Sequence, residues 1–125
     1  MCPGDTFLLD VGLGKHLYVV LSHPRNEDNK FVAAMISTWD DQRKNDSCVL
    51  RVADGHTFLK HDSYVAFNTA LLLHESDINR LGAKPKQSFT PQVVSRILQG
   101  ANSDNSDLPS KYWCIMDRQG LFVDK

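Results

Sequence analysis

One stretch of the chain, Gly-His-Thr-Phe-Leu-Lys-His-Asp-Ser-Tyr-Val at residues 55–65, concentrates side chains that transfer protons or bind anions. An imidazole has an ordinary pKa close to neutral pH, so a histidine in this stretch can serve as a general acid or a general base. We expect His61 to be catalytic, because Lys60 and Ser63 stand close to it at a junction between a loop and a strand. Lys60, Ser63 and Tyr64 are predicted to bind the substrate.

The histidines also have structural explanations. His56 follows Asp-Gly, a strong hairpin signal, and is typical of a turn position. The hydroxyl residues after His61 can close the loop through hydrogen bonds. His23 stands before a proline and His74 ends an apolar run, so we expect a surface turn and a strand end at these two positions.

Neither a metal site nor a disulfide is predicted. His56 and His61 stand five residues apart on an expected loop, whereas a metal site needs three or four converging ligands. Cys2, Cys48 and Cys114 are an odd number of cysteines with no close pair, which favours reduced intracellular thiols over a disulfide framework. No cofactor is expected.

The composition is that of a globular domain. The chain has 125 residues, of which 42% are hydrophobic and 23% are charged. Lys plus Arg number 14 and Asp plus Glu number 15, so the net charge of −1 excludes a strongly basic chain and leaves only a local patch to contact nucleic acid. The longest apolar run, residues 31–36, is far shorter than the ~18 residues of a membrane span. With no signal peptide at the N-terminus, we expect a cytoplasmic protein that does not contact membranes.

The first part of the chain predicts a small β-barrel core over residues 4–73. Short runs of alternating or fully apolar residues are separated by turn residues such as Gly, Pro, Asn and Asp. The run at 31–39 is apolar on both faces, as in a central strand, and the run at 64–73 is either one long strand or a strand that bends near Asn68. The five expected strands are residues 6–11, 16–22, 31–39, 47–52 and 64–73. Their spacing favours a small barrel or a sandwich.

The last third predicts a helix at residues 91–99. Thr90 is a suitable N-cap, Pro91 suits the first helical position, and Gly100 is expected to end the helix. Phe89 and Val94 are placed to form a hydrophobic staple. The remaining expectations are a one-turn helix at 76–81, a polar linker at 101–111, and an apolar segment at 112–116 that forms a late strand or a plug against the core. We therefore predict a single domain spanning residues 1–125.

Three segments of this chain together resemble the opening of the MazF/PemK toxin family. They are Gly-Asp before a strand in GDTFLLDVG at 4–12, the strand ending in Leu-Ser in KHLYVVLS at 15–22, and the strand ending in Ser-Thr in FVAAMIST at 31–38. The resemblance covers about residues 4–39. It implies the SH3-like barrel that this family shares with the DNA-gyrase-poisoning CcdB-like toxins. It also implies a homodimer, a cognate antitoxin protein, and metal-independent cleavage of single-stranded RNA.

The resemblance also implies a second group of site residues. Lys15 and His16 occupy the positions before the second strand where the family has arginines, and Ser37 and Thr38 fall where it has a hydroxyl residue. An arginine holds phosphate through paired N–H groups and is always charged, whereas an imidazole is mostly neutral at pH 7. We therefore expect His16 to be a second acid or base, Lys15 to supply fixed charge, and Ser37 and Thr38 to bind the phosphate.

Together these observations predict a toxin-like endoribonuclease of a toxin–antitoxin system. RNA cleavage through the 2′-hydroxyl needs a base, an acid and a cation, and the two groups of residues contain all three. Two alternatives remain open on the same fold. One is a non-catalytic small-barrel module that binds protein or nucleic acid, and the other is a gyrase-targeting toxin without a nuclease site.

Overall fold

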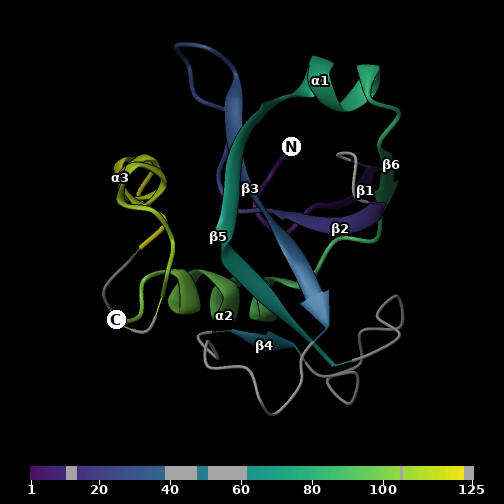
Figure 1. The fold of residues 1–125 in the computed structure, drawn as a ribbon. Helices are drawn as coiled ribbons and strands as arrows, with labels where there is room; N and C mark the ends of the chain where they lie inside the picture. Colours follow the sequence, from purple (N-terminus) through teal and green to yellow (C-terminus); the bar gives the residue numbers. More distant parts are fainter. Residues whose placement is uncertain (11–13, 39–47, 51–61, 105, 123–125) are drawn as a thin grey trace.

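The computed structural model describes residues 1–10, 14–38, 48–50, 62–104 and 106–122. Within them, six strands form one curled antiparallel sheet in the order β4-β5-β3-β2-β1-β6 (Figure 1). The strands are β1 (Thr6–Asp10), β2 (Lys15–Val20), β3 (Lys30–Thr38), β4 (Val49–Leu50), β5 (Ser63–His74) and β6 (Lys84–Lys86). The helices are α1 (Glu75–Arg80), α2 (Pro91–Ala101) and α3 (Ser110–Arg118). The expected mainly β class is confirmed, and the curled sheet agrees with a small barrel.

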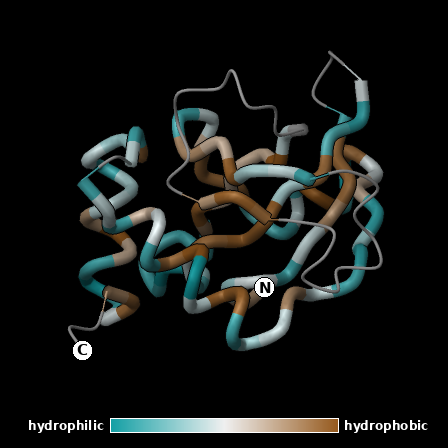
Figure 2. The backbone as a smooth tube through the Cα atoms, turned by 90° about the horizontal axis from the view of Figure 1, so that it is seen from below, coloured by the Kyte–Doolittle hydropathy of each residue, from teal (hydrophilic) through white to brown (hydrophobic). Residues whose placement is uncertain are grey.

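Strand β3 is the centre of the sheet and buries both of its faces, as its apolar run predicts. Val32 and Ala34 pack into a core that also takes in α2 and α3, here called the helix-side core. Phe31 and Ala33 pack into a second core with Ile78 of α1, here called the α1-side core. Figure 2 shows the hydrophobic segments gathered in the middle of the molecule and the hydrophilic segments around them.

Strand β5 bends in its middle, which agrees with the expectation of a strand that bends near Asn68. Ala33 pairs with Leu71 and Met35 pairs with Ala66, so two steps along β3 correspond to five steps along β5. The extra residues form a β-bulge around the exposed Asn68. Thr69 fills the gap in the ladder, because its Oγ1 accepts a hydrogen bond from the Met35 N–H at 2.9 Å and donates one to the Ala66 carbonyl at 2.6 Å.

Helix α2 begins where the sequence predicts and ends later. Thr90 caps it, with Oγ1 accepting from the Val93 N–H, and Pro91 is its first residue. Gly100 does not end the helix, because α2 continues to Ala101 and both residues are buried against the sheet. The Asn102 N–H then closes the last turn on the Leu98 carbonyl. Packing of the last turn therefore outweighs the helix-ending preference of glycine.

The short helix α1 is confirmed, and it gives His74 a structural role. The His74 imidazole accepts a hydrogen bond from the Ser76 N–H, while the Asp77 carboxylate accepts one from the His74 N–H. This reciprocal arrangement is a capping box, which satisfies two backbone donors at the start of the helix.

Two elements of the second half differ from the sequence expectations. Residues 110–118 form α3, so the expectation of a late strand is wrong, although Met116 is fully buried in the helix-side core as a plug would be. An apolar run of five residues is too short to show a helical period.

Strand β6 was not expected at all, since its sequence is Lys-Pro-Lys and all three residues are exposed. It pairs with β1 at the edge of the sheet, where proline is tolerated. Within the described residues, no helix has the length and apolar character needed to cross a membrane.

Candidate functional site

Four neighbouring strands reach one end of the sheet together, here called the site edge. Because the strands are antiparallel, the site edge holds the last residues of β1 and β3 and the first residues of β2 and β5. Along β1 and β2, Leu9 pairs with His16 and Asp10 with Lys15. Along β3 and β5, the Cα partners are Ser37 with Tyr64 and Thr38 with Ser63. Two groups of residues that are far apart in the sequence therefore meet across the sheet.

Three of the expected site residues, His16, Ser37 and Tyr64, stand at neighbouring strand ends on one face of the sheet, here called the His16 row. The ladder between β2 and β3 ends at the pair Leu17 with Ile36, and His16 and Ser37 are the next residues beyond it on the two strands. Alternate residues of a strand share a face, so His16 lies on the α1-side face with Tyr18, and Ser37 lies there with Met35. Tyr64 is the register partner of Ser37 and shares its face.

The burial of the row changes from strand to strand. His16 and Ser37 are half-buried, whereas the Tyr64 side chain is buried with 9% of its surface exposed. An imidazole at a rigid strand end with access to solvent can meet a substrate without moving the backbone. The row thus combines an accessible proton-transfer group with two hydroxyl groups.

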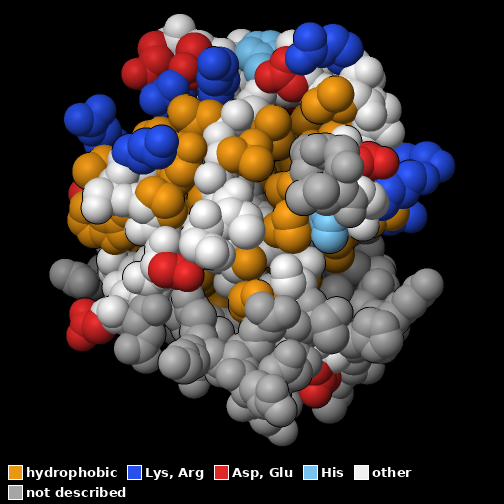
Figure 3. Space-filling view, in the orientation of Figure 1, with side chains coloured by type: hydrophobic (Ala, Val, Ile, Leu, Met, Phe, Trp, Pro, Cys, Tyr) orange, Lys and Arg blue, Asp and Glu red, His pale blue; other side chains and the backbone are white. Residues whose placement is uncertain are grey.

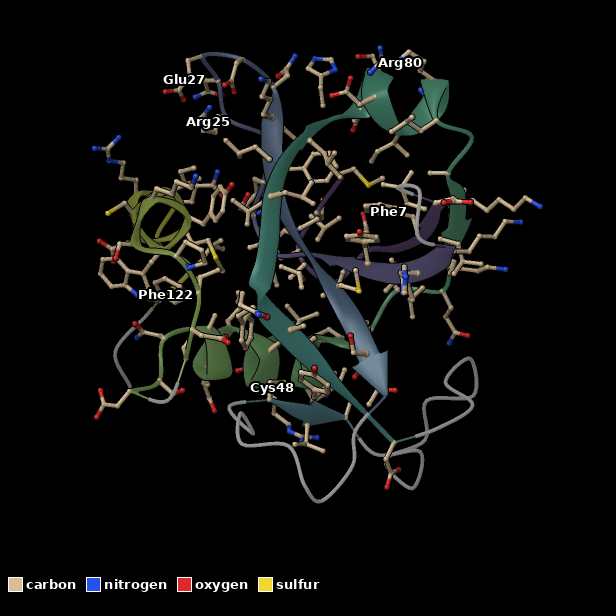
Figure 4. The ribbon with its side chains drawn as sticks, in the orientation of Figure 1. Phe7, Arg25, Glu27, Cys48, Arg80 and Phe122 are labelled. Atoms are coloured by element: carbon tan, nitrogen blue, oxygen red, sulfur yellow. The ribbon has the colours of Figure 1, made fainter. Side chains whose placement is uncertain are left out.

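Behind the His16 row the face is closed by aromatic rings. Tyr18 follows His16 on the same face and is 1% exposed. Its ring stacks on that of Phe7 with centroids 5.6 Å apart, and Phe7 meets Phe31 edge to face (Figure 4). Burial raises the pKa of the Tyr18 phenol, so this group stays neutral. The rings form a fixed apolar floor beside the His16 row.

The opposite face of the site edge carries the second set of expected residues. Lys15 is exposed, Ser63 is buried, and Thr38 is the Cα partner of Ser63. Lys15 precedes His16 in β2 and pairs with Asp10 of β1, so its side chain starts from the face opposite His16. A cation here is suited to a phosphate that lies across the strand ends.

Two of the expected site residues, His61 and Lys60, lie outside the described residues, as does His56. The described chain resumes at Asp62, which is half-buried and directly precedes β5. His61 therefore stays a sequence prediction. Of the other described histidines, His23 lies in the turn between β2 and β3 and His74 ends β5, both at the end of the sheet away from the site edge.

Compared with protein-family models and with curated proteins, the sequence matches none. The resemblance to the MazF/PemK family therefore rests on the strand segments and residues quoted for it.

Sequence reasoning missed two cations on the edge strand β6, of which Lys84 pairs with Leu8 near the site edge and Lys86 with Thr6 at the other end of β1. Lys84 and Lys86 of β6 are exposed, and Lys84 pairs with Leu8, which also pairs with Leu17 of β2. Figure 3 shows Lys and Arg side chains gathered at the right-hand edge of the molecule, the side on which β6 lies in Figure 1. Together with Lys15 they place three cations on β2 and β6, next to the carboxylate of Asp10 at the end of β1. Lysine and proline also protect an exposed strand edge from pairing with another chain, so the two roles can coincide.

Within the described ranges, no cluster of side chains is a candidate metal site. No group of three or more His, Cys, Asp or Glu side chains is placed there to hold an ion. What the described residues of the site edge can do is move protons and bind anions.

Proposed function

We propose that this chain is a toxin-like, metal-independent endoribonuclease that cleaves single-stranded RNA at the site edge. The observation that carries the proposal is the His16 row: His16, Ser37 and Tyr64 lie on one face at adjoining strand ends, with Lys15 next to His16 in β2 on the opposite face. The curled sheet is taken as the SH3-like barrel of the MazF/PemK family, which the strand segments at 4–38 resemble.

The residues present can perform cleavage through the ribose 2′-hydroxyl. A base removes the 2′-hydroxyl proton, the 2′-oxygen attacks phosphorus, and the bond to the 5′-oxygen breaks as an acid protonates that oxygen. The products are a 2′,3′-cyclic phosphate and a 5′-hydroxyl. His16 supplies one of the two proton-transfer groups, and His61, next to the start of β5 in the sequence, supplies the other. Lys15 offsets the charge that develops on the phosphate, and Ser37 or Thr38 donates a hydrogen bond to one of its oxygens.

Positive charge at the edge is suited to a flexible polyanion. Lys15, Lys84 and Lys86 offer phosphate contacts on β2 and β6, two strands that both neighbour β1. A homodimer would combine two such edges, and an antitoxin protein would cover them in the cytoplasm. These partners are proposed from the family resemblance.

The contribution of the β6 lysines can be measured by the dependence of RNA binding on salt. Each lost phosphate contact lowers the slope of log K against log salt by about 0.7 for a single strand, so Lys84→Gln with Lys86→Gln should lower it by about 1.4. A control that removes the same charge elsewhere is Lys30→Gln with Lys111→Gln, because both residues are exposed and lie away from the site edge. Equal slopes for the two double variants would contradict the proposal that Lys84 and Lys86 of β6 contact the RNA phosphates.

The reaction itself is tested with the purified protein and an end-labelled single-stranded RNA in excess EDTA. The proposal predicts cleavage, with a cyclic phosphate on one fragment and a 5′-hydroxyl on the other. Salt-dependent RNA binding without cleavage would favour the non-catalytic binding module. Growth arrest of a bacterial host without RNA cleavage would favour the gyrase-targeting toxin. Either result would overturn the proposed reaction.

A further inference from the structure

A concave surface lies at the end of the sheet opposite the site edge. The turn between β2 and β3 and the C-terminal end of α3 enclose a cleft of about 500 Å³, here called the turn–helix cleft. Arg25 and Glu27 of the turn line it on one side, and Arg118 of α3 lines it on the other. Figure 4 shows Arg25 and Glu27 next to each other on this turn, above α3. The cleft therefore has charged groups on both walls.

The two walls of the cleft are fastened to each other. The His23 N–H donates to Oε1 of Gln119 at 2.7 Å, and Nε2 of Gln119 donates to the His23 carbonyl at 2.8 Å. This paired bond imitates one step of a β-ladder between the turn and the end of α3. The width of the cleft is therefore set before any ligand arrives, which lowers the entropy cost of binding.

The turn itself is held by its own hydrogen bonds. The Asp28 carboxylate accepts from the Arg25 guanidinium and from the Lys30 N–H. The Asn29 N–H donates to the Arg25 carbonyl at 2.7 Å, with Asn29 in the left-handed region at φ 56°. Hydrogen bonding from Arg25 lowers the pKa of the Asp28 carboxyl, so the pair stays ionised near neutral pH. Arg25 is thus fixed in place while part of its five-donor guanidinium still faces the cleft.

Arg118 provides a second guanidinium group in the cleft. It is exposed at the end of α3, and within the described part of the chain its guanidinium makes no hydrogen bond or ion pair. A guanidinium matches the oxygens of a phosphate through two parallel N–H bonds. The apolar side chain of Ile115, one turn earlier on α3, lines the same cleft. Anion-binding and apolar surfaces therefore lie side by side.

We propose that the turn–helix cleft binds a phosphate monoester whose organic group is about the size of a nucleoside. Arg118 and the remaining donors of Arg25 bind the phosphate, Ile115 packs on the organic group, and the Glu27 carboxylate accepts hydrogen bonds from its hydroxyl or amino groups. A cleft of this volume is much larger than an inorganic phosphate ion, which is the reason for assigning an organic group. This site does not depend on the proposed RNA cleavage, since it lies at the other end of the sheet.

The test is a titration of the full chain with each probe, monitored by two-dimensional NMR. The side-chain amide of Gln119 is the reporter, because it donates to His23 within the cleft. The probes are adenosine 5′-monophosphate, inorganic phosphate and adenosine. We expect the monophosphate to shift the reporter, inorganic phosphate to shift it with weaker affinity, and adenosine to leave it unchanged. Loss of hydrogen bonds to a charged group predicts that Arg118→Gln weakens binding of the monophosphate about tenfold or more.

A matched control removes the same charge from the same helix. Lys111 is exposed at the start of α3 and does not line the cleft, so Lys111→Gln should change the affinity less than twofold. The proposal is overturned if adenosine shifts the reporter as strongly as the monophosphate, or if no probe shifts it. It is also overturned if Arg118→Gln and Lys111→Gln weaken binding equally, since that would reflect overall charge and not a built site.

Discussion

The bulge in β5 depends on one hydroxyl group, and replacing Thr69 by Val tests this dependence. Thr69 Oγ1 accepts from the Met35 N–H and donates to the Ala66 carbonyl, which are the groups that the interrupted ladder between β3 and β5 would otherwise leave without a partner. Valine keeps the shape of the side chain and removes both bonds. The variant therefore isolates the hydrogen bonds from the packing.

The expected loss of stability follows from those two bonds. A typical hydrogen bond contributes about 1 kcal/mol, and leaving a partly buried partner without one costs about 1–3 kcal/mol. Because Thr69 and Met35 are only half-buried, water can replace part of the loss. We expect Thr69→Val to lower the free energy of unfolding by about 2–3 kcal/mol.

Urea denaturation measures that free energy, and amide hydrogen exchange measures the local effect. Thr69→Ser keeps both hydrogen bonds and loses one methyl group, so it should cost under about 1 kcal/mol. In Thr69→Val the Met35 amide should exchange faster than in either of the other two proteins. A valine variant within about 0.5 kcal/mol of wild type, with an unchanged Met35 amide, would refute the role given to Thr69.

Two further predictions concern buried groups on other elements. Burial raises the pKa of the Cys48 thiol to about 11. At pH 8 a thiol reagent should therefore modify the exposed Cys2 and Cys114 quickly in the folded protein and Cys48 only after denaturant is added. The raised pKa also means that Cys48 contributes stability at low pH that is lost between about pH 9 and pH 11, so a Cys48→Ala variant should lose less stability than wild type across that range. At the N-terminus, Gly4 has φ 96°, and an added Cβ would overlap Cγ2 of Val94 on α2. Gly4→Ala should cost about 2–3 kcal/mol in urea denaturation, and an unchanged midpoint would contradict the close approach of this turn to α2.

The sequence correctly predicted those helices and strands whose formation depends mainly on their own residues. The unbroken apolar run of β3 requires burial on both faces, and Thr90 with Pro91 marks the start of α2 by capping chemistry alone. Both were confirmed. Helix α3 could not be separated from a strand, because Met116 shows its burial only once the helix-side core is formed.

The site edge depends on pairing between distant segments, which the sequence does not display. Ser37 and Tyr64 were identified separately, but their contact follows from β5 lying beside β3 with its register set after the bulge. Lys84 and Lys86 have no apolar period and pair only because β1 offers a free edge. The Lys-Pro-Lys run is polar and contains proline, so nothing in it predicted a strand.

The central claim is that His16 transfers a proton during RNA cleavage, and a pair of identical substitutions tests it most directly. His16→Asn removes the imidazole from the site edge, whereas His74→Asn removes one from the far end of β5 and keeps a good helix N-cap. Cleavage of single-stranded RNA is measured under single-turnover conditions for both folded variants. The account predicts a loss of about 10²-fold or more for His16→Asn and a rate close to wild type for His74→Asn. Equal rates for wild type and His16→Asn would contradict it.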